Sequence, residues 1–86
     1  MLRIAVISAI LEDPNSSQKE FNQVVSEYVD IVRGRMGIPF EDGDIGIVSI
    51  VVVGTLNQIN SFTGRIGNIK NVIVKTAISK KEVGGN

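Results

Sequence analysis

The segment Arg33-Gly34-Arg35-Met36-Gly37 is the one local cluster in this sequence with the residue types of a small-ligand site. In an extended strand, alternate residues lie about 6.6 Å apart on one face, so the guanidinium groups of Arg33 and Arg35 could address one anion. Glycines at positions 34 and 37 would let a ligand or a partner backbone approach closely. We therefore predict a ligand-binding site formed by Arg33, Gly34, Arg35 and Gly37.

A plainer interpretation of the same segment is an edge strand that binds no ligand. Charged side chains on an edge strand prevent unwanted pairing with other chains, and glycines allow such a strand to bend. The residue types favour this plainer interpretation, and the sequence leaves both of them open.

The composition argues against most metal and acid–base chemistry. The chain has no His and no Cys, which removes the usual ligands of zinc, copper and nickel and the commonest catalytic groups. Glu41, Asp42 and Asp44 lack the spacing of an EF-hand calcium loop and are expected to form a hairpin turn around Gly43. We therefore predict no catalytic residue, no metal site and no cofactor.

Length and charge restrict the class of protein further. A chain of 86 residues forms one domain and buries only about 60–65% of its unfolded surface. Nine basic and nine acidic residues cancel, which argues against a dedicated nucleic-acid binder. The longest uncharged apolar stretch, Ile45 to Leu56, is far shorter than the roughly 20 residues of a membrane helix. We expect a cytoplasmic protein that binds neither a membrane nor nucleic acid directly.

Hydrophobic periodicity predicts four strands and two helices that must position these residues. The expected strands are residues 3–11, 30–38, 45–53 and 71–79, and the expected helices cover residues 17–29 and 55–67. Each helix is expected to begin at a capping box, formed by Ser17 with Glu20 and by Thr55 with Gln58. The second helix is expected to bury Leu56 and to end with Gly67 in the left-handed conformation.

The order β-α-β-β-α-β is that of a ferredoxin-like α+β sandwich, in which a four-stranded antiparallel sheet carries two helices on one face. We assign residues 1–79 to one such domain and residues 80–86 to a flexible polar tail. RNA recognition motifs share this order, but they stack bases on aromatic side chains of the first and third strands. Those strands contain no aromatic residue here, so nucleic-acid binding through the sheet is not expected.

The first and third strands are apolar at both alternating sets of positions, as RIAVISAIL and IGIVSIVVV show. Two helices can cover only one face of the sheet, and a large uncovered apolar face is unusual for a soluble monomer. The simplest cover is a second copy of the chain. We therefore expect a homo-oligomer, a dimer or a tetramer, that associates through a sheet face or a sheet edge.

Four segments give the chain a resemblance to a known family. They are RIAVISAILED, DIVRGRMGIPF, VVVGTLNQINSFTGRIGNI and VIVKTAIS. Over roughly residues 2–79, the chain resembles the family described as regulators of the iron-only hydrogenase system. That family is similar in fold to ACT domains and to the C-terminal regulatory domain of the nickel-responsive repressor. The resemblance implies an ACT-like domain that associates through its sheet and binds a small effector at a subunit interface.

Two departures limit what the resemblance implies. The nickel-responsive repressor binds its metal through His and Cys, which this sequence lacks, so no nickel site carries over. That repressor also has an N-terminal ribbon-helix-helix element, whereas the regulatory-type fold is expected to begin here within the first few residues. The resemblance therefore implies a regulator of transcription or of the hydrogenase system without its own DNA-binding element.

Three functions remain open on the sequence alone. The leading hypothesis is a non-enzymatic regulatory domain that senses a small effector, such as an anion near Arg33 and Arg35. The alternative is a structural protein–protein interaction module with no small ligand. An enzyme of the ferredoxin-like barrel type is disfavoured, because the chain has no His, no Cys and no evident acid–base pair.

Overall fold

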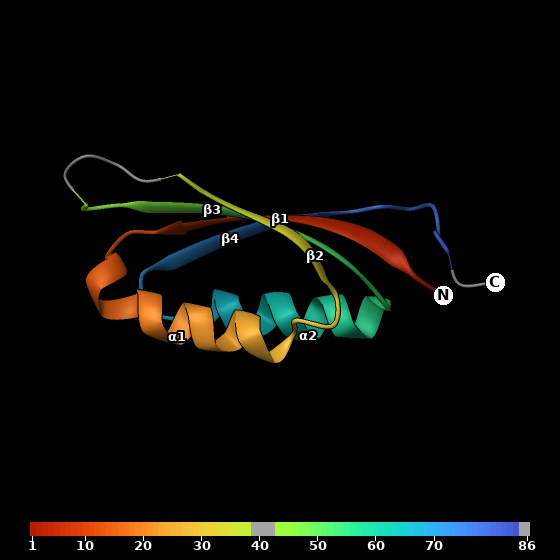
Figure 1. Ribbon diagram of the computed structural model, residues 1–86, viewed down its shortest axis with the longest axis horizontal. Helices are drawn as coiled ribbons and strands as arrows, with labels where there is room; N and C mark the ends of the chain where they lie inside the picture. The colour runs from red at the N-terminus through yellow and green to blue at the C-terminus, as the bar shows by residue number, and fades with distance from the viewer. Residues whose placement is uncertain (39–42, 85–86) are drawn as a thin grey trace.

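The computed structural model describes residues 1–38 and 43–84. Six elements follow one another: β1 (Arg3–Leu11), α1 (Pro14–Glu27), β2 (Val32–Ile38), β3 (Gly46–Gly54), α2 (Leu56–Gly67) and β4 (Val72–Ile78). The four strands form one antiparallel sheet in the order β2-β3-β1-β4. Both helices lie on the same face of this sheet (Figure 1). The predicted ferredoxin-like, ACT-like fold class is confirmed.

The hydrophobic core lies between the two helices and the sheet face that they cover. Alternate residues of β1 and β3 point into it, among them Ile7 and Ile50, which are paired in the register and fully buried. Phe21 of α1 and Phe62 of α2 meet them from the helix layer and are also fully buried. Two apolar helical stripes therefore account for the burial of one face of the sheet.

The start of α1 differs from the prediction. The helix begins at Pro14, with Asp13 as its N-cap, and no side chain caps it. Ser17 is a buried residue inside the first turns, and its hydroxyl donates to the carbonyl oxygen of Asp13 at 3.0 Å. The predicted capping box of Ser17 and Glu20 is therefore wrong. Proline suits the first helical position because its φ is already helical and it has no N–H to leave unpaired.

The start of α2 confirms the prediction, and its end corrects it. The amide of Gln58 donates to the Thr55 hydroxyl at 3.1 Å, and the Thr55 amide donates to Gln58 Oε1 at 2.8 Å. Leu56, predicted to be buried, is 42% exposed. Gly67 lies inside the helix, and the left-handed residue is Asn71 instead, with φ of 64° in the turn before β4.

A bulge in β2 changes which of its residues share a face. The register with β3 shifts between Val32 and Gly34, so that Arg33 is an extra residue in the strand. Val32 lies opposite the buried Val52, whereas Met36 lies opposite Ser49, on the other face. The strict alternation predicted for this strand is therefore wrong on the N-terminal side of the bulge.

Two further predicted segments are described only in part. The predicted hairpin turn at Glu41, Asp42, Gly43 and Asp44 lies partly outside the described residues, although Gly43 has the expected positive φ of 71°. Within the predicted tail, the Val83 amide donates to the Leu2 carbonyl at 2.8 Å and forms one bridge beside β1. Among the described residues, no helix is long and apolar enough to cross a membrane.

Candidate functional site

A pocket of about 460 Å³ lies between the N-terminal half of α1 and the adjacent ends of β2 and β3. It exists because the edge strand β2 presents little bulk toward the helix layer here. Gly37 lies opposite the buried Val48, and a Cβ added to it would meet only the carbonyl oxygen of Ile47, at 3.9 Å. The missing side chain at Gly37 therefore leaves open a space that α1 does not fill.

The lining of the pocket combines one cation with carboxamides and apolar walls. Arg35 contributes the positive charge, and α1 contributes the side chains of Asn15, Gln18 and Asn22. Apolar lining comes from several residues, including Leu11, Phe21 and Ile47. Such a surface favours a ligand with an anionic group at one end and an apolar portion at the other.

The guanidinium of Arg35 is held in a defined position at the pocket. Its Nη2 donates to Asn22 Oδ1 at 2.6 Å, and its Cζ lies 5.7 Å from the centre of the Phe21 ring. Among the described residues, the only salt bridge joins Arg65 and Glu27, so no described carboxylate neutralises Arg35. A positioned arginine whose other donors bond no residue that the structure describes is suited to recognise a carboxylate or a phosphate.

The structure brings together two of the four predicted site residues. Arg35 and Gly37 line the pocket, whereas Arg33 and Gly34 do not. Gly34 lies opposite Val51 on the face away from the helices, and Arg33 is an exposed residue at the bulge. Alternation therefore no longer supports a shared face for Arg33 and Arg35, and the assignment of Arg33 and Gly34 to a site stays a prediction.

The sequence reasoning missed the carboxamides of α1. Asn15, Gln18 and Asn22 are spaced by three and four residues, which places them on one helical face beside the buried stripe. A helix predicted to begin at Ser17 leaves Asn15 outside it, so this polar stripe was not visible. Recognition of Pro14 as the first helical residue is the signal that would have found it.

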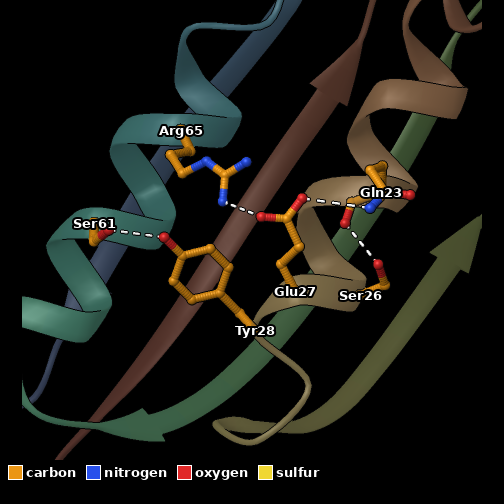
Figure 2. A network of polar contacts seen from close by, with 6 residues as sticks. All are labelled: Gln23, Ser26, Glu27, Tyr28, Ser61 and Arg65. Atoms are coloured by element: carbon orange, nitrogen blue, oxygen red, sulfur yellow. Dashed lines mark hydrogen bonds and ion pairs between the residues drawn. The ribbon is translucent and has the colours of Figure 1, made fainter.

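A second group of polar side chains joins the two helices near the end of α1 (Figure 2). Arg65 donates to Glu27 at 2.5 Å, and the hydroxyls of Tyr28 and Ser61 are 2.7 Å apart. The Tyr28 ring packs on Phe62 with 4.8 Å between ring centres. These groups are paired with one another, so the cluster serves to lock α1 to α2.

Hydrogen bonding sets the charge states in this interhelical cluster. The Arg65 guanidinium, helped by Gln23, holds the pKa of the Glu27 carboxyl below its ordinary value. The Ser61 hydroxyl, followed by Arg65, lowers the pKa of the Tyr28 phenol. Glu27 in turn raises the pKa of Arg65. The pair Glu27–Arg65 is therefore ionised at neutral pH.

A metal centre is not evident in the described residues, where no three acidic, His or Cys side chains gather. The absence of a metal and of a cofactor therefore remains a prediction from the composition. The candidate site is the pocket beside Arg35, whose chemistry is binding by charge, amide hydrogen bonds and apolar contact.

Comparison with solved structures shows that the fold is the one found in ACT domains. The ACT domain of GTP pyrophosphokinase from Chlorobium tepidum matches with a TM-score of 0.67 and 18% identity, over 86% of this chain and 96% of that one. A protein described as a proposed glycine cleavage system transcriptional repressor matches with a TM-score of 0.67 and 12% identity, over 100% of this chain and 51% of the other. At these identities the likeness shows the fold alone.

The family is shown by the sequence itself. The family model TM1266-like, which describes regulators of the iron-only hydrogenase system and gives that role as a proposal, matches residues 3–76. The chain therefore belongs to this family, and the resemblance inferred from its four segments is confirmed. The uncharacterized protein TM1266 from Thermotoga maritima has a TM-score of 0.86 and 22% identity, over 93% of this chain and 100% of its own. No curated protein sequence matches the chain.

Proposed function

We propose that this protein is a cytoplasmic regulatory domain that senses a small anionic effector in the pocket beside Arg35 and works as a homo-oligomer. The observation that carries the proposal is the position of Arg35, which is held by Asn22 and Phe21 in the lining of a pocket that contains no described acidic residue. Membership in a family described as regulators supports a sensing role over a catalytic one. The regulated process would be transcription or the hydrogenase system, without direct contact to nucleic acid.

The lining supports a small carboxylate with an apolar portion as the effector class. The carboxylate would accept hydrogen bonds from the Arg35 guanidinium and from the side-chain carboxamide nitrogens on α1. The apolar portion would pack against Leu11 and Phe21. The volume of about 460 Å³ falls in the usual range for small-molecule sites.

A thermal-shift screen of small organic acids tests the effector pocket. We expect at least one acid to raise the Tm of the wild-type protein by several degrees, and Arg35→Gln to abolish that shift. Gly37→Leu should abolish it as well, because the new side chain would occupy the open space beside Val48. Arg33→Gln is the matched control, since Arg33 lies outside the pocket lining.

The outcomes separate the alternatives. A shift that persists in both Arg35→Gln and Gly37→Leu would overturn the pocket as the effector site. A shift lost in Arg33→Gln as well would support the larger site predicted from the sequence. No shift with any acid, together with capture of a partner protein, would favour the alternative of a structural interaction module, for which the apolar sheet face away from the helices is the supporting observation.

A further inference from the structure

The sheet has one face that no described helix covers. Figure 1 shows both helices on the opposite side. On this open face the exposed fractions of large apolar side chains are high, with Val6 at 43%, Ile10 at 40%, Met36 at 60% and Ile73 at 44%. An apolar surface that spans all four strands calls for a partner.

The strand registers align the side chains of the open face into three rows that cross the whole sheet. One, which we name the isoleucine row, consists of Ile38, Ile47, Ile10 and Ile73. The next, the central row, consists of Met36, Ser49, Ser8 and Lys75. The third, the small row, consists of Gly34, Val51, Val6 and Ala77.

The two outer rows are complementary in size and lie at equal distances from the central row. On β1, for example, Ile10 and Val6 lie two residues on either side of Ser8. A two-fold axis laid along the central row, midway between two facing sheets, would exchange the two ends of every strand. Each isoleucine row would then lie over the small row of the partner, which keeps the sheet separation near the usual value of about 10 Å.

We propose that the open face binds a second copy of this chain about such an axis, with the isoleucine row of each copy packed on the small row of the other. The other in-plane axis, along the strands, would place isoleucine on isoleucine at one end and glycine on alanine at the other. That arrangement would force the sheets apart at one end and leave a gap at the other, at a cost in packing.

Area and charge limit how strong this interface can be. With strands about 4.8 Å apart and a rise of about 3.3 Å per residue, the three rows of two such faces cover roughly 800 Å², the size of a weak interface. Lys75 is the only charged residue in the three rows, and it lies on the edge strand β4. The axis places Lys75 opposite its own symmetry mate, and the long side chain lets both ammonium groups turn outward into water at the edge of the sheet.

This inference rests on the proposed self-association. It adds that the two copies meet through the open face of the sheet and not through its edge strands. Ile38 and Ile47 of the isoleucine row also line the effector pocket, so the substitutions that test the docking are placed on β1, at positions 6, 8 and 10, which lie outside that lining. Failure of the docking geometry can therefore be distinguished from failure of effector sensing.

Charge substitutions in the two outer rows test the geometry. We expect Ile10→Lys and Val6→Glu each to weaken dimerisation about a hundredfold, because each buries two unpaired charges in a symmetric dimer. In an equal mixture, the lysine introduced by Ile10→Lys in one copy would face the glutamate introduced by Val6→Glu in the other, while the second contact stays native. Sedimentation velocity should therefore show monomers for each variant alone and a restored dimer for the mixture.

Each deviation from this pattern has a stated meaning. A wild-type protein that sediments as a 9.3 kDa monomer at micromolar concentration would overturn self-association altogether. A dimer that survives both substitutions would overturn the face and leave an edge. Loss of dimer in both variants without rescue in the mixture would overturn the pairing of isoleucine row with small row.

A cross-linking measurement keeps the proposal testable if the charged variants fail to fold. The chain has no cysteine, so a single Ser8→Cys variant introduces a unique thiol in the central row. A short bismaleimide should join two copies of this variant, because the axis places position 8 near its own symmetry mate. Asn60→Cys, on the exposed side of α2, is the matched control and should not cross-link; equal cross-linking of the two variants would overturn the proposal.

Discussion

The two faces of this sheet have similar side chains and different neighbours. Ile7 and Ile50 on the helix-covered face are completely buried, whereas Val6 and Ile10 on the open face are about two-fifths exposed. The strand sequence alone does not distinguish them, since both sets are aliphatic and alternate along β1 and β3. The difference teaches that the count of helices, not strand hydrophobicity, determines which face needs a partner.

The largest expected effect is on the covered face. Ile50→Ala removes a fully buried side chain at the centre of the core and should lower the free energy of unfolding by about 3 kcal/mol. The loss should be the same at every protein concentration, because the helices of the same chain cover this face. Urea unfolding at two protein concentrations measures the size of the loss and shows whether it depends on concentration.

Val51, which follows Ile50 in β3 and lies on the open face, should respond differently to truncation. Val51→Ala removes two methyl-sized groups from the small row and should cost about 1 kcal/mol. Because a second copy would supply the contacts, this loss should be visible at high protein concentration and fade on dilution. A Val51→Ala effect that does not change with concentration would contradict the comparison of the two faces.

The helix layer offers a test that belongs to the covered face only. Thr55→Ala removes the hydroxyl that accepts from the Gln58 amide and should lower the free energy of unfolding by about 1 kcal/mol. Asp13→Ala is the matched control, because the Asp13 side chain makes no capping hydrogen bond. It should lower the free energy of unfolding by only a few tenths of the loss expected for Thr55→Ala. Thermal unfolding of both variants should show a clear gap in Tm between them.

The smallest effect concerns the ion pair between the helices. The pKa of Glu27 is held below its ordinary value of 4.5 by Arg65, so the pair stabilises the fold above that pH and the contribution is lost as the pH falls further. In Glu27→Gln, the free energy of unfolding should therefore fall slightly less between pH 7 and pH 3 than it does in the wild-type protein. At pH 7 the substitution should change it by only a small amount, because both side chains of the pair are solvated. Tm values of both proteins measured between pH 7 and pH 3 check this prediction. The same fall in Tm for the variant and the wild type would refute a role for the pair.

Much of the fold could be predicted from the sequence because its signals are local. The bounds of β1 and the capping box at Thr55 follow from short patterns that the structure reproduces. The Ser17 capping box was wrong because a matching pattern competed with Pro14 three residues earlier, and proline determined where α1 begins.

The candidate site was less accessible to sequence reasoning because it depends on pairing between distant residues. The bulge at Arg33 is set by the register of β2 on β3, which no local pattern encodes. Arg35 and Asn22 are separated by 13 positions and meet only because α1 lies against the edge of the sheet. The pocket therefore follows from tertiary packing, and strand alternation alone could identify only its arginine and Gly37.

The most direct test of the account is sedimentation velocity on an equal mixture of Ile10→Lys and Val6→Glu, compared with each variant alone. The account predicts monomers for the separate variants and a dimer for the mixture, because the open face would pair the isoleucine row of one copy with the small row of the other. Monomers in all three samples, beside a wild-type dimer, would contradict this pairing; unchanged dimers in all three would show that the open face is not the interface.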